Sequence, residues 1–94
     1  MMKQLLLILG LTLASVPAQA ACYADYKAKQ DDPLRLHYGV AELPDSACSR
    51  QAAAQALQPR LAREGWTLLN ILSIFGPEGL AERKASAGQY FLRY

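Results

Sequence analysis

The chain has 94 residues, two of them cysteines, and carries 10 Lys and Arg against 8 Asp and Glu. A net charge of +2 with no basic cluster argues against binding to nucleic acid or to an anionic membrane. The length predicts one domain, whose small core gives only marginal stability by packing alone.

The first 20 residues have the order of a secretory signal peptide. Lys3 supplies a positive charge, residues 5–13 form an apolar run too short to span a bilayer, and Ala18-Gln19-Ala20 is an A-x-A cleavage site. A weaker second site lies two residues upstream, and a buried N-terminal helix is the alternative. We expect cleavage after Ala20 and an exported protein, periplasmic or secreted, made of residues 21–94 without another apolar run of membrane length.

The two cysteines, Cys22 and Cys48, both lie after the predicted cleavage site. Two cysteines in a short exported chain predict a disulfide, and a loop of this length is worth about 3 kcal/mol in the chain-entropy model. The alternative is a lipid attached to Cys22. Gln19 argues against it, because a bacterial lipidation site usually has an aliphatic residue three positions before the cysteine.

Two segments, residues 22–29 and 34–43, alternate between apolar and polar positions as half-buried strands do. The first segment is also rich in Ala and Lys, which favour helix. We prefer a hairpin about residues 30–33, because it returns Cys22 to the end of the second strand, close to Cys48. A helix rises too little per residue to bring the two cysteines together in this way.

A helix is predicted over residues 47–64. Asp45 or Ser46 can cap its first turn, and apolar residues recur at helical spacing. Pro59 is expected to kink or divide the helix, and Gly65 is expected to end it.

The remaining elements are predicted from two further patterns. Residues 66–75 are apolar on both faces and predict a central strand, with Trp66 buried at its start as an anchor of the fold. Residues 89–94 alternate and predict a final strand. Between them, residues 80–84 are expected to form a helical turn within a long linker.

These elements predict an α+β domain over residues 21–94, with an antiparallel sheet of three to four strands packed on one helix in the order strand-strand-helix-strand-strand. Glu64-Gly65-Trp66 and Tyr90-Phe91-Leu92-Arg93 resemble the pattern of a family of short bacterial proteins of unknown function. The resemblance covers roughly residues 34–94. It implies the fold, and it implies no activity, because that family has none assigned.

The linker before the last predicted strand is the first candidate for a binding site. Long loops on a rigid sheet often carry function, and this one ends in charged residues. A linker with no role is the alternative. The candidate residues are Phe75, Gly76, Pro77, Glu78, Gly79, Leu80, Arg83 and Lys84.

A second candidate is a binding platform on one face of the sheet, formed by tyrosine side chains. Ordinary half-buried packing is the alternative. The tyrosines are Tyr23, Tyr26, Tyr38, Tyr90 and Tyr94.

No motif in the sequence indicates catalysis. The single histidine, His37, is expected on the surface beside Arg35, and there is no second histidine to share a metal ion. A Cys–His pair would need a free thiol in an oxidising compartment. We therefore expect a non-enzymatic exported module without cofactor or metal that binds an unknown protein or small ligand. The alternative is an envelope-associated structural protein or a lipoprotein anchored through Cys22.

Overall fold

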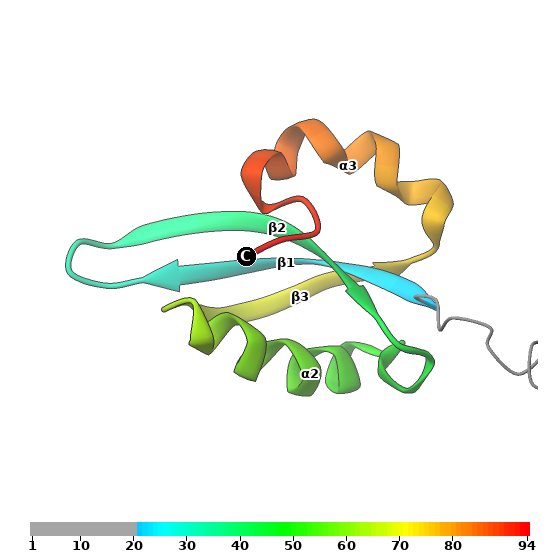
Figure 1. The fold of residues 1–94 in the computed structure, drawn as a ribbon, viewed down its shortest axis with the longest axis horizontal. Coiled ribbons are helices and arrows are strands. Elements are labelled where there is room, and N and C mark those ends of the chain that lie inside the picture. The colour runs from blue at the N-terminus through cyan, green and yellow to red at the C-terminus, as the bar shows by residue number, and fades with distance from the viewer. Residues whose placement is uncertain (1–20) are drawn as a thin grey trace, which may run out of the picture.

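The computed structural model describes residues 21–94, so the predicted signal peptide lies outside the described residues. They form a three-stranded antiparallel sheet with one helix on each face (Figure 1). The elements are β1 (Cys22–Gln30), β2 (Arg35–Leu43), α2 (Arg50–Arg63), β3 (Thr67–Phe75) and α3 (Leu80–Ala87). The predicted α+β class and the antiparallel sheet are confirmed.

The predicted hairpin is confirmed over its whole length. β1 and β2 pair antiparallel from Cys22 opposite Leu43 to Gln30 opposite Arg35. Residues 22–29 are therefore strand, although their composition also suits a helix, because pairing with β2 and burial of alternate side chains outweigh intrinsic propensity.

The hairpin register also places the two cysteines together. Cys22 and Cys48 form a disulfide, with their Cα atoms 6.0 Å apart. The bond ties the first strand to the turn that leads into α2. It also uses the thiol that lipidation of Cys22 would require, so the two modifications exclude each other.

The core lies between the sheet and α2. Tyr26 and Leu43 from the sheet and Leu57 and Leu61 from the helix are fully buried. Trp66 is 8% exposed and packs against this core, so its predicted burial is confirmed.

The ends of α2 differ in part from the prediction. Ser49 caps the helix by accepting a hydrogen bond from the Ala52 N–H at 3.2 Å, whereas Asp45 and Ser46 lie in a preceding 3₁₀ turn. The helix is not divided at Pro59 and continues to Arg63. Gly65 follows with φ 83°, the left-handed conformation that glycine adopts without strain.

The predicted strand over residues 66–75 is confirmed as β3, but its predicted central position was wrong. The strand order is β2-β1-β3, so β1 is central and β3 is an edge strand. The register of β3 with β1 shifts twice, and Leu69, which is skipped at one of these shifts, is 49% exposed.

The prediction of a final strand over residues 89–94 was also wrong. α3 runs from Leu80 to Ala87, longer than the expected turn, and a short 3₁₀ helix, Gly88–Tyr90, follows. The chain then crosses the free edge of β2, where it makes one isolated parallel bridge between Val40 and Phe91 (Figure 1). The alternation of residues 89–94 therefore reflects a tail that wraps around an edge.

Candidate functional site

The predicted binding loop folds onto the sheet face opposite α2. Arg83 lies over the ring of Phe75, with its guanidinium carbon 3.9 Å from the ring centroid. The same side chain donates to the Gly79 carbonyl at 2.8 Å and to Asp25 Oδ2 at 3.1 Å. The Arg83 side chain is thus engaged within the domain, while Glu78 and Lys84 remain exposed.

Asp25 is the partner that holds α3 to the sheet. It is 7% exposed, and it also accepts hydrogen bonds from Ser73 Oγ at 2.6 Å and Tyr38 Oη at 2.8 Å. Burial alone would raise the pKa of Asp25, but the hydrogen bonds from Ser73, Tyr38 and Arg83, together with the charge of Arg83, hold the pKa below its usual value. These hydrogen bonds join β1, β2, β3 and α3, so the cluster stabilises the fold.

His37 lies on the other face, where α2 packs, and its predicted surface position was wrong. It is 7% exposed and sits opposite Ala28 of β1. Its ring stacks on Tyr90, with centroids 3.7 Å apart, and meets the edge of Trp66 at 4.2 Å. The tail that carries Tyr90 is what buries it, and no local sequence pattern shows this contact.

The surroundings of the two His37 ring nitrogens favour the neutral imidazole. Nε2 is hydrogen-bonded to the hydroxyl of Tyr26 at 3.1 Å, and Nδ1 has no partner within residues 21–94. Burial lowers the pKa of His37 to about 4, so the imidazole is neutral near pH 7. Gly39 makes room for this pair, because a Cβ there would collide with the Tyr26 side chain.

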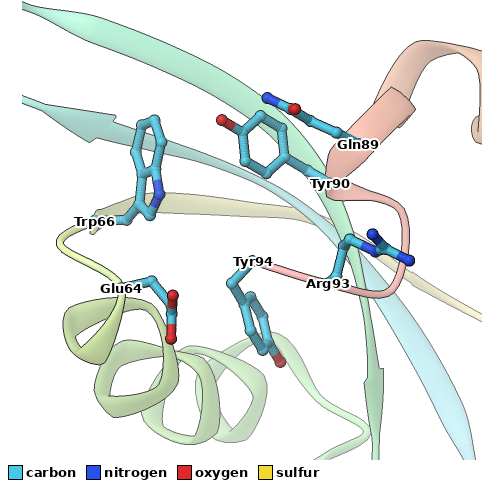
Figure 2. Close-up of a pocket in the computed structure, with 6 residues that line it drawn as sticks. All are labelled: Glu64, Trp66, Gln89, Tyr90, Arg93 and Tyr94. Carbon is cyan, nitrogen blue, oxygen red and sulfur yellow. The ribbon is translucent and has the colours of Figure 1, made fainter.

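A hollow of about 280 Å³ opens beside this aromatic cluster, between the end of α2, the start of β3 and the tail (Figure 2). We call it the tail pocket. It is lined by Glu64, Trp66, Gln89, Tyr90, Arg93 and Tyr94.

The walls of the tail pocket are held by contacts behind them. Tyr90 is supported by its stacking on His37, and it meets Trp66 edge to face with centroids 5.6 Å apart. Tyr94 accepts a hydrogen bond from Arg60 of α2 at 3.0 Å, and the same guanidinium nitrogen donates to the Glu42 carbonyl at 2.9 Å. The three rings are therefore positioned before any ligand arrives.

The polar groups of the tail pocket are mostly unpaired. Within residues 21–94, no side-chain hydrogen bond or ion pair involves Glu64, Gln89, Arg93 or the indole nitrogen of Trp66. That nitrogen still reaches solvent, because His37 Nδ1 is the one fully buried side-chain polar atom there without a partner. The pocket thus presents open donors and open acceptors together with apolar rings.

Neither of the two binding sites predicted from the sequence, the loop and the tyrosine platform, coincides with the tail pocket. The tyrosines do not share one face, since Tyr23 stacks on Phe75 and Tyr38 bonds Asp25 on the α3 side, while Tyr90 and Tyr94 line the tail pocket. The predicted loop contributes no side chain to this pocket.

A signal for the tail pocket was present in the sequence. The two short motifs that carry the family resemblance supply Glu64, Trp66, Tyr90 and Arg93 to its lining. We interpreted these motifs as structural only, because nothing local shows that they meet.

Neither a cluster of metal ligands nor a membrane-spanning helix is found in this part of the chain. Over residues 21–94 there is no cluster of three or more His, Cys, Asp or Glu side chains that could hold a metal ion. No helix among the same residues combines the length and apolar character needed to cross a bilayer.

Comparison with known proteins identifies no relative. The sequence matches no protein-family model, and searches of curated proteins and of solved structures find no match either. The resemblance to a family of short bacterial proteins therefore stays a prediction.

Proposed function

We propose that this protein is an exported, non-enzymatic module that binds a small ligand in the tail pocket. The observation that carries the proposal is the set of unpaired polar groups beside three preorganised aromatic rings. Ligand sites commonly combine rings with a few convergent polar groups, and a volume of about 280 Å³ suits a ligand of one ring or a few residues.

Export is part of the proposal, and it rests on two features. The first is the signal-peptide pattern of residues 1–20, and the second is the disulfide, which is typical of proteins in oxidising compartments. We expect the mature N-terminus to be Ala21. N-terminal sequencing of protein recovered from the envelope or medium tests this, and material that begins at Met1 would contradict it.

A lipoprotein or envelope-associated structural role through Cys22 was the alternative. Attachment of a lipid needs the thiol that is joined here to Cys48. Intact mass with and without reductant distinguishes the two, because the disulfide adds two hydrogens on reduction whereas a lipid adduct remains.

Binding can be followed without a label, because Trp66 is the single tryptophan and it lines the pocket. Purified residues 21–94 should show a saturable change in tryptophan emission with at least one class of small envelope or extracellular compound. The panel should contain sugars, amino acids, quaternary amines, phosphate and short peptides. Glu64→Gln should weaken that binding by about tenfold, as loss of a charged acceptor typically does.

The matched control is Glu78→Gln, which removes the same charge from the exposed predicted loop. It should bind like the parent protein. The proposal fails if no class binds in the millimolar range, or if Glu78→Gln weakens binding while Glu64→Gln does not.

A further inference from the structure

The chemistry of the tail pocket narrows the class of ligand, and this step rests on the proposed function. The lining has one full negative charge, on Glu64, and one full positive charge, on Arg93. A simple cation would be attracted by Glu64 and repelled by Arg93, and a simple anion would meet the reverse. Arg60, which lies behind Tyr94 and donates to its hydroxyl, adds a second positive charge near the pocket that further disfavours cations.

The hydrogen-bonding groups have a complementary arrangement. The Glu64 carboxylate can only accept, and the indole N–H of Trp66 can only donate. Figure 2 shows the indole nitrogen on the side of the ring that faces the hollow, and Glu64 below it at the end of α2, next to Tyr94. A hydroxyl group is a donor and an acceptor at once, so a ligand with hydroxyls can pair with either group.

Gln89 and Arg93 are the polar groups on the tail side. The Gln89 amide both donates and accepts, and the Arg93 guanidinium donates several hydrogen bonds. Neither has a side-chain partner within residues 21–94. In Figure 2 the Arg93 guanidinium points away from Glu64 and from the hollow, so Arg93 adds positive charge beside the pocket and no hydrogen bond within it. Gln89 is therefore the tail-side group that a second hydroxyl of a ligand would bond.

The aromatic rings of the pocket can pack against the apolar face of a sugar. Trp66, Tyr90 and Tyr94 surround the hollow, and their faces carry partial negative charge. The C–H groups on one side of a pyranose are weakly positive and apolar, so they pack against such faces. The hydroxyls at the edge of the pyranose ring can then bond the Glu64 carboxylate and the Gln89 amide. We infer that the tail pocket binds a neutral saccharide, one pyranose ring at a time.

The test uses residues 21–94 with the disulfide intact. The probes are glucose, galactose and N-acetylglucosamine with their disaccharides, and the comparison compounds are choline chloride, alanine and sodium phosphate. Emission of Trp66 and amide chemical shifts are followed for the parent protein, Glu64→Gln and the control Glu78→Gln. We expect saturable binding of at least one neutral sugar, a weakening of about tenfold in Glu64→Gln, and no change in Glu78→Gln.

A second variant removes the indole donor while keeping an aromatic ring in the core. Trp66→Phe should also weaken sugar binding, measured by chemical shifts because the fluorophore is lost, and its melting curve shows whether the fold is kept. If alanine, choline or phosphate saturates the pocket and no sugar does, the saccharide assignment is overturned and the proposed function stands. If no compound binds, both are overturned. Equal sugar affinity of the parent and Glu64→Gln also overturns the assignment.

Discussion

Acid should destabilise this domain through His37. The pKa of His37 is lowered to about 4 by burial, against 6.5 for an exposed histidine. Between pH 4 and pH 6.5 the unfolded state therefore binds more protons than the native state. Stability is complete above pH 6.5 and falls as the pH decreases toward 4.

The size of the effect follows from the pKa difference. About 2.5 units correspond to about 3 kcal/mol of unfolding free energy lost across the window. A domain of this size has roughly 4–11 kcal/mol in total, so the loss is a large fraction. The physical cause is local, because a second proton on the imidazole would place a positive charge among Tyr26, Trp66 and Tyr90 without an acidic partner.

The assay is urea unfolding at a series of pH values from 7.5 to 4, followed by Trp66 emission. The control is His37→Phe, which keeps a ring against Tyr90 but cannot titrate. This variant should be about 1–3 kcal/mol less stable at pH 7, since the Tyr26 hydroxyl loses its partner, yet it should lack the acid-dependent loss of about 3 kcal/mol. Asp25 does not confuse the comparison, because its lowered pKa keeps it ionised above pH 4. Parallel stability curves for the two proteins would refute the reasoning.

Three further perturbations test the packing. Trp66→Ala should cost about 3–5 kcal/mol by thermal or urea unfolding, and a variant that melts within a few degrees of the parent would contradict this anchor. Cys48→Ser should cost about 3 kcal/mol, with reductant lowering the melting temperature of the parent and not of the variant; equal sensitivity would mean that the crosslink to Cys22 does not stabilise the domain. Arg83→Met should cost about 2–3 kcal/mol because Asp25 stays buried without its cation, while the exposed control Lys84→Met stays within about 0.5 kcal/mol; equal losses would rule out a structural ion pair.

Local features were predictable because their causes lie close together in the sequence. The hairpin followed from two alternating segments about a turn, and the disulfide followed from the register that this turn imposes. Gly65 ended the helix because few other residues adopt its φ of 83°. Burial of Trp66 followed from its size and its position between helix and strand.

The arrangement of the elements could not be predicted in the same way. Hydrophobic alternation shows which side of a strand is covered, but it does not show which strand lies beside it. β1, with its lysines, became the central strand, and the apolar β3 became an edge. Residues 89–94 alternate like a strand, yet they pair with β2 through one bridge at Val40, because the tail crosses the sheet edge instead of following it.

The tail pocket could not be predicted from the sequence. The sequence alone specified the hairpin, the disulfide, the main helix and the buried tryptophan, since each depends on neighbouring residues or on one chain reversal. Only the tertiary structure decided that the tail returns over β2, stacks Tyr90 on His37 and closes a pocket against Glu64 and Trp66. Those contacts join segments separated by many residues. The tail covers the edge of β2 and the His37 ring, and no local sequence pattern specifies which segment will do so.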